Sequence, residues 1–156
     1  MLNKTQQGII DALRTVFPLS EVPVIYTVDV PADFQRPSFF LDLLPWRGAN
    51  ITTNIRHYPI TWQLVYFPPL DDAGNEDVEV LRAVAVKLDE LFGQVYTLPL
   101  PDGSMASITD FAWDERDGTG YATVALSVFM LREDEEPAPV QFLELKFLNL
   151  SINPNS

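Results

Sequence analysis

His57 is the only histidine in the chain, so a Ser-His-Asp triad or a histidine-based metal site would have to be built on it. The activated serine of such a triad is often held in a Gly-x-Ser-x-Gly motif, which is absent. Cysteine is absent too, which excludes thiolate catalysis, disulfides and cysteine-based metal sites. Arg56 and Tyr58 on either side are typical of an exposed strand, so His57 is expected to be a structural or interface residue.

Acidic residues gather around two predicted turns and are the next candidates for a metal site. A calcium loop of the EF-hand type needs oxygen ligands at positions 1, 3 and 5 and glycine at position 6. Counting back from Gly118 places Trp113 at position 1, and counting back from Gly74 places Pro69 there. Both loops therefore fail the pattern, and their acids are expected to be solvated. The two groups are Asp71, Asp72, Glu76 and Asp77, and Asp110, Asp114, Glu115 and Asp117.

Other chemistry finds little support in the residues. Two carboxylates could in principle hydrolyse a glycosidic bond, but acid pairs arise by chance in so acidic a chain. No glycine-rich phosphate loop or dinucleotide motif is present, and no cofactor or metal is expected. Phe39, Phe40, Trp46, Trp62, Tyr66 and Phe67 could stack bases, but Lys and Arg are not regularly interleaved among them, which disfavours that role. The sequence therefore predicts a protein that is not an enzyme, with a carboxylate-based hydrolase as the weakest alternative.

The composition indicates a packed globular protein. Of 156 residues, 47% are hydrophobic and 12% aromatic, enough to form a substantial core in one domain. The net charge of −12, from 22 acidic and 10 basic residues, disfavours binding to a nucleic-acid backbone. No apolar run is long enough to cross a bilayer, and no secretory signal is visible, so we expect assembly in the cytoplasm and no membrane partner.

The periodicity of apolar residues predicts two helices and a sheet. Residues 3–17 and about 76–92 carry helical apolar stripes, with Asn3 or Thr5 as the expected cap of the first. Apolar runs of strand type lie between and after them. The expected fold class is α+β: a largely antiparallel β-sheet with two helices packed on one face, plus a C-terminal extension. The predicted strands are 22–30, 38–44, 52–67, 94–100, 105–113 and 120–132.

Pro37 opens the second predicted strand, because it cannot donate to a sheet ladder and restricts Arg36 before it. In that strand Phe39, Leu41 and Leu43 point to one face, and Ser38, Phe40 and Asp42 to the other. A change of character at 133–139, an acidic segment with two prolines, predicts a linker. The expected organisation is a domain over 1–132, this linker, and a C-terminal extension over 140–156.

Two segments favour assembly over chemistry. Trp46 and Arg47 stand together in a predicted loop, and both residue types are enriched at interface hot spots, although a plain surface loop is the alternative. The segment 140–150 alternates as a strand does, and it is expected to extend either its own sheet or a neighbour's. The interface candidates are Trp46, Arg47, Arg56, His57, Phe142, Leu143, Leu145 and Phe147.

The order of elements and the local residues together resemble the tail terminator family of tailed phages and related prophage-derived particles. The resemblance covers about residues 1–132. It runs from the first helix through Phe34-x-Arg36-Pro37-Ser38-Phe39-Phe40-Leu41 to Arg56, the strand Ile60-Thr61-Trp62-Gln63-Leu64-Val65-Tyr66-Phe67 and the second helix. The motif is short and hydrophobic, and the correct context on both sides strengthens it. The extension over 133–156 goes beyond the family pattern.

The resemblance implies a virion structural protein with no catalytic residues. Such subunits form a hexameric ring on the head-proximal end of the tail tube, stop its polymerisation and present the surface that joins the head. The implied partners are further copies of the chain, the tail tube protein, and a neck, head-completion or sheath protein. The alternatives are another neck or head-tail joining protein, or an acidic binding domain without a phage role.

Overall fold

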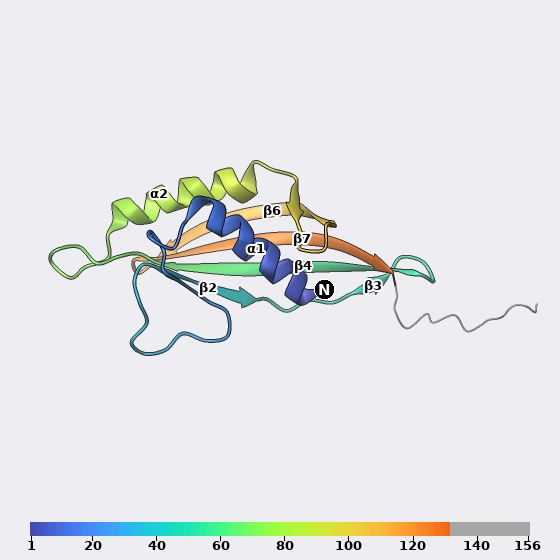
Figure 1. The fold of residues 1–156 in the computed structure, drawn as a ribbon, viewed down its shortest axis with the longest axis horizontal. Coiled ribbons are helices and arrows are strands. Elements are labelled where there is room, and N and C mark those ends of the chain that lie inside the picture. The colour runs from blue at the N-terminus through green and yellow to red at the C-terminus, as the bar shows by residue number, and fades with distance from the viewer. Residues whose placement is uncertain (132–156) are drawn as a thin grey trace, which may run out of the picture. The chain divides into compact units, whose positions relative to one another are not determined.

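The computed structural model describes residues 1–131, which contain two helices and a seven-stranded sheet. Figure 1 labels the helices and most of the strands. A short π-helical turn, η1, follows the second helix. In chain order the elements are α1 (Leu2–Val16), β1 (Val24–Tyr26), β2 (Ser38–Leu43), β3 (Ala49–Asn50), β4 (Ile55–Phe67), α2 (Val78–Leu88), η1 (Asp89–Gly93), β5 (Thr97–Pro99), β6 (Met105–Arg116) and β7 (Thr119–Leu131).

Helix α1 forms as its apolar spacing predicts, with Ile9 and Leu13 fully buried one turn apart. Its N-cap is Met1, without a side-chain hydrogen bond, so the expected cap at Asn3 or Thr5 is wrong. Thr5 lies inside the helix and its hydroxyl donates to the carbonyl of Leu2. The helix ends before Pro18, which cannot continue its hydrogen bonds.

Helix α2 has a side-chain cap. The carboxylate of Asp77 accepts a hydrogen bond of 3.2 Å from the backbone N–H of Val80, which satisfies one of the free donors of the first turn. Leu81, Val84 and Leu88 form the buried stripe. The helical path continues as η1 to Gly93, so the predicted range 76–92 describes an α-helix and a π-helical turn together.

The strand order is β1-β2-β4-β7-β6-β5, with β3 paired to β4. Strands β2 and β4 are antiparallel, as are the pairs β3–β4, β5–β6 and β6–β7. Strand β1 runs parallel to β2, with Val24 beside Ser38, because residues 27–37 carry the chain back before β2 begins. The sheet is therefore mixed, and the prediction of a largely antiparallel sheet is wrong on this point.

The register of β2 against β4 confirms the predicted division of β2 into two faces. Phe39 stands beside Tyr66 and Leu41 beside Leu64, and all four side chains are buried. The ring of Phe39 packs against Tyr66 at 5.0 Å between centroids and against Phe17 at 5.2 Å. This aromatic cluster joins the end of α1 to the centre of the sheet.

Four strands differ most in extent from the prediction. Strand β5 spans only Thr97–Pro99, where 94–100 was expected. The run 22–30 supplies only the three residues of β1, and Val28 beyond it is 85% exposed. The predicted strand 52–67 begins at Ile55, and β3 before it forms a hairpin with it. Strand β6 extends to Arg116 and meets β7 in a tight turn at Asp117 and Gly118.

The chain divides into two compact units. Unit 1 contains residues 1–48 and 58–128, and the described part of unit 2 contains 49–57 and 129–131. Unit 1 holds the core, in which α1 meets β4 through a hydrogen bond between Trp62 and Thr5. Helix α2 meets β7 at Gly120, where Leu81 and Trp113 leave no space for a side chain.

Candidate assembly surface

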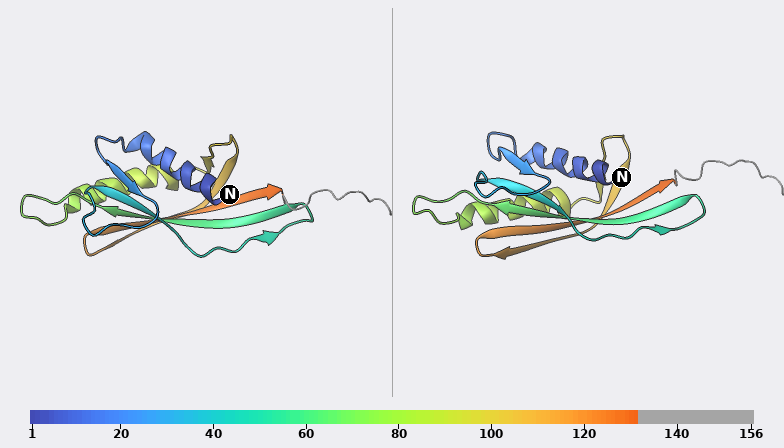
Figure 2. Two further views of the ribbon diagram at one scale, coloured as in Figure 1. Left: turned by 60° about the horizontal axis from the view of Figure 1, so that its bottom comes forward. Right: turned by 90° about the horizontal axis from the view of Figure 1, so that it is seen from below.

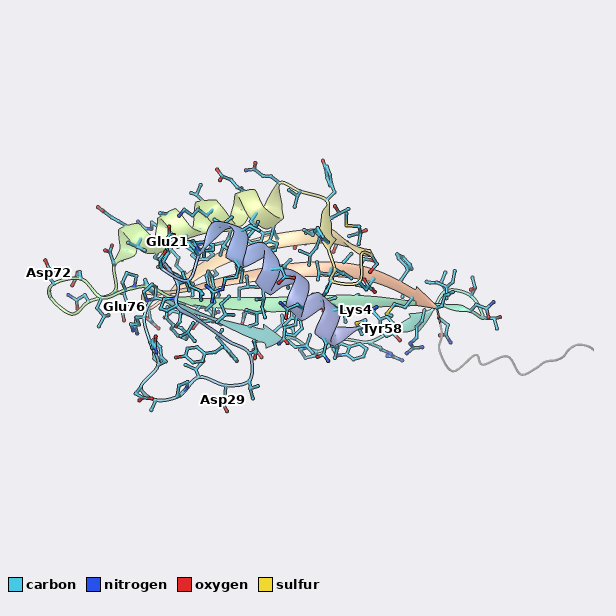
Figure 3. The ribbon with its side chains drawn as sticks, viewed as in Figure 1. Lys4, Glu21, Asp29, Tyr58, Asp72 and Glu76 are labelled. Carbon is cyan, nitrogen blue, oxygen red and sulfur yellow. The ribbon has the colours of Figure 1, made fainter. Side chains whose placement is uncertain are left out.

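Trp46 lies in the loop after β2 in unit 1 and is 40% exposed. Its ring packs edge-on against Tyr58 of β4, which is labelled in Figure 3, at 5.8 Å between centroids. Arg47 follows it and is exposed. Tyr58 therefore covers part of the indole, while Trp46 stays partly exposed and the neighbouring Arg47 is exposed. Such a pair suits contact with another protein.

The described part of unit 2 is organised by the β3–β4 hairpin. Ala49 pairs with His57 and Asn50 with Arg56, and the guanidinium of Arg56 donates a 2.9 Å hydrogen bond to the side-chain oxygen of Asn50. The hydroxyl of Thr52 accepts hydrogen bonds from the backbone N–H groups of Asn54 and Ile55. These bonds fix the turn, which gives the hairpin a defined shape.

The same unit exposes apolar side chains. The imidazole of His57 stacks on Phe129 with 4.6 Å between centroids, which leaves Phe129 59% exposed. Exposed apolar side chains that gather in one small unit are typical of a protein–protein contact. We call this set the unit 2 apolar group: Ile51, Ile55, Phe129 and Leu131.

The acidic residues form no metal site within residues 1–131, because no group of three or more potential ligands gathers there. Asp29 and Asp72 lie at the tips of two different loops, as Figure 3 shows. Asp71 is used as a turn residue, since its side chain accepts hydrogen bonds from the backbone N–H groups of Ala73 and Asn75.

Two titratable groups are shifted, and both have structural explanations. Burial raises the pKa of Tyr66 to about 12, with smaller contributions from the charges of Asp77 and Glu21. The ammonium of Lys4 donates a 2.8 Å hydrogen bond to Asp102, which together with Ser104 lowers the pKa of that carboxyl. Asp102 is at the surface, and Tyr66 stands in the core, so neither forms a reactive cluster.

The structure accounts for the sequence-based candidates in three ways. Trp46 and Arg47 lie in an exposed loop of unit 1, and Arg56 and His57 lie on the hairpin of unit 2. Sequence reasoning missed the unit 2 apolar group. In β7 the buried residues are even-numbered, so the odd-numbered Phe129 falls on the other face of the strand. This alternation could have indicated Phe129 from the sequence. The remaining candidates lie outside the described residues: Phe142, Leu143, Leu145 and Phe147.

Comparison with known proteins gives one family. The sequence model of a family described as phage tail terminator protein matches residues 5–138, which is most of the chain. A search of curated proteins finds no match. Within residues 1–131, neither helix has the length and apolar character needed to span a membrane. The family match begins in α1 and continues past β7, so it includes every strand described above.

Proposed function

Because the chain belongs to the phage tail terminator family, we propose that it forms a ring that caps the tail tube, stops its polymerisation and offers the surface that joins the head. The family match is the observation that carries this proposal. Tail terminators are structural components of the virion tail, and they associate with tube and head proteins. The proposed site of action is accordingly the virion, after assembly in the host cytoplasm.

The proposed mechanism is steric and associative. A subunit that binds the last tube ring through a complementary face, and offers no such face on its other side, ends the polymer without any covalent step. A closed ring needs a heterologous contact in which two different patches of each subunit match. We assign one of these patches to the unit 2 apolar group, whose exposed side chains lose contact with water when a neighbour covers them.

We further propose that both helices cover one face of the sheet and leave the other face for the ring. The contacts of Thr5 with Trp62 and of Leu81 near Gly120 support this arrangement. The views in Figure 2, in which α1 and α2 lie on the same side of the strands, support it too. We expect a hexamer, the number that the family resemblance implies.

A capping assay tests the proposal. A tail tube protein from the same phage or particle is allowed to polymerise with and without the full-length protein, and tube lengths are measured by negative-stain electron microscopy. Substoichiometric protein is expected to shorten the tubes and to bind at one end only. Tubes of unchanged length with undecorated ends would reject a terminator role. If the protein bound only the head portal, another neck protein, the alternative reading, would be favoured.

The assay has an internal test of the unit 2 apolar group. Phe129→Ala removes an aromatic ring that is 59% exposed, and we expect it to raise the concentration needed for capping at least tenfold. Tyr96→Ala is the matched control, because it removes an aromatic ring that is 86% exposed in unit 1. Equal effects of the two substitutions would show that the unit 2 apolar group contributes no more to the contact than an exposed ring in unit 1.

A further inference from the structure

Strand β6 has a long open edge, although it lies inside the strand order. Its other neighbour, β5, pairs only with Met105 to Ser107, and one more backbone bond joins Ile108 to Tyr96. From Phe111 to Arg116, β6 pairs with β7 alone within the described residues. An open strand edge of this length is a template for another strand.

The turn that joins β6 to β7 decides which backbone groups point to this edge. Asp117 and Gly118 both have positive φ, so they form a two-residue hairpin that Arg116 and Thr119 close as a hydrogen-bonded pair. Hydrogen-bonded and non-hydrogen-bonded pairs alternate along an antiparallel ladder. The N–H and C=O groups of the intervening residues therefore point away from β7, into the open edge: Phe111, Trp113 and Glu115.

The side chains along this edge form two rows. Asp114 and Arg116 share the outer row, with the carboxylate and guanidinium 3.1 Å apart and each side chain more than half exposed. Trp113 and Glu115 share the other row, where the indole nitrogen donates to the carboxylate of Glu115 at 3.3 Å. A docking strand would thus meet an acid–base pair on one side and an indole on the other.

The sequence of the chain itself contains a segment whose residue pattern fits this edge. In residues 140–150, Glu144 and Lys146 alternate with Leu143, Leu145 and Phe147. An antiparallel register that places Lys146 opposite Asp114 places Glu144 opposite Arg116, so both outer pairs are of opposite charge. The same register places Phe147 opposite Trp113. A parallel alignment that places Glu144 opposite Asp114 would oppose like charges at both positions, which disfavours it.

The direction of β7 favours pairing of this edge with the C-terminal segment of a second copy, rather than with the chain's own. The antiparallel register requires residue 144 to lie at the Arg116 end of the edge. Strand β7 begins at that end with Thr119 and runs away from it. A chain's own tail would have to return along the whole sheet before pairing, whereas a neighbouring subunit in a ring needs no such return.

We propose that residues 143–149 of one subunit add to the open edge of β6 of the next subunit as an antiparallel strand, with Lys146 opposite Asp114. This contact rests on the proposed ring, and it supplies an interface that links each subunit to its neighbour. It is a case of strand addition, in which backbone hydrogen bonds give affinity and side-chain matching fixes the register.

The absence of cysteine allows a direct test by disulfide trapping. In the proposed register residues 114 and 146 form a non-hydrogen-bonded pair, whose spacing suits a disulfide. Full-length Asp114→Cys protein carrying a size tag is mixed with untagged Lys146→Cys protein under mild oxidation. We expect a covalent dimer of mixed size. Glu144→Cys with tagged Asp114→Cys is the matched control, since residue 144 stands two positions out of register, and we expect at least fivefold less product.

The outcomes separate this contact from the ring itself. A ring seen by size exclusion with no excess of the 114–146 product would overturn strand addition and leave the terminator proposal standing. A doubly substituted chain that closes its disulfide only within the monomer would show that the tail pairs with its own sheet, which also contradicts the proposal. A protein that stays monomeric with tube protein present and forms no product would contradict both.

Discussion

The indole nitrogen of Trp62 donates a 3.0 Å hydrogen bond to the hydroxyl of Thr5, and both residues are buried. The same hydroxyl donates to the backbone of Leu2 at 2.9 Å, so Thr5 acts at once as acceptor for the sheet and donor to its own helix. The two residues are 57 positions apart in the chain. This hydrogen bond fixes the position of the first turns of α1 relative to β4.

Thr5→Ala is therefore expected to destabilise the protein by about 1–3 kcal/mol, because it leaves the buried indole N–H without its partner. Thr5→Ser keeps the hydroxyl and is expected to cost less. Urea unfolding followed by tryptophan fluorescence measures both free energies. Equal losses for the alanine and serine variants would show that the methyl group of Thr5, rather than its hydroxyl, provides the stability.

Gly8→Ala tests how closely α1 approaches β5. Alanine usually stabilises a helix over glycine by roughly 0.5–1 kcal/mol. Here an added Cβ would lie 2.9 Å from the carbonyl oxygen of Pro99 and 3.0 Å from the side chain of Leu100. We expect the sign to reverse, with a loss of about 1–3 kcal/mol in thermal or urea unfolding. Asn3→Ala, at an exposed position of the same helix, is the control and is expected to change little.

The raised pKa of Tyr66 predicts a loss of stability in alkali. Its folded pKa of about 12 lies above the ordinary tyrosine value of 10.0, so the unfolded state releases the phenolic proton first as the pH rises. The contribution of Tyr66 is fully present below pH 10 and is lost between pH 10 and 12. Unfolding free energies measured through this range are expected to fall less steeply for Tyr66→Phe than for the wild type. If the two curves of unfolding free energy against pH were parallel, Tyr66 would have the same pKa in the folded and unfolded states.

Deletion of residues 140–156 separates assembly from folding. If the segment serves as a connector between subunits, the truncated chain keeps its circular dichroism spectrum and its thermal transition but associates at least tenfold more weakly. The association is measured by sedimentation velocity across a concentration series. A truncated chain that no longer folds would instead make the segment part of the core.

Local patterns in the sequence predict those helices and strands in which buried residues recur with the period of that type of element. Trp62, Leu64 and Tyr66 alternate in β4, and all three are buried. Both helices follow from apolar residues spaced three and four apart. The resemblance that includes Phe34-x-Arg36-Pro37 led to the family that the comparison identifies.

Features set by distant partners could not be predicted in this way. The parallel pairing of Val24 with Ser38 depends on the path of residues 27–37, which carries no periodic signal. Asn50 lies in a strand only because Arg56 pairs with it across the hairpin. The open edge of β6 is a property of what β5 leaves uncovered, and β5 is only three residues long. Partner strands, rather than local propensity, decide these features.

The claim that the chain forms a ring is tested by the mass of the full-length protein in solution, with and without tube protein. We expect a closed ring of about 106 kDa for six copies of the 17.6 kDa chain, either alone or once tube protein is added. Light scattering coupled to size exclusion resolves that mass from a monomer. A protein that stays monomeric at every concentration and does not bind tube protein would contradict the claim.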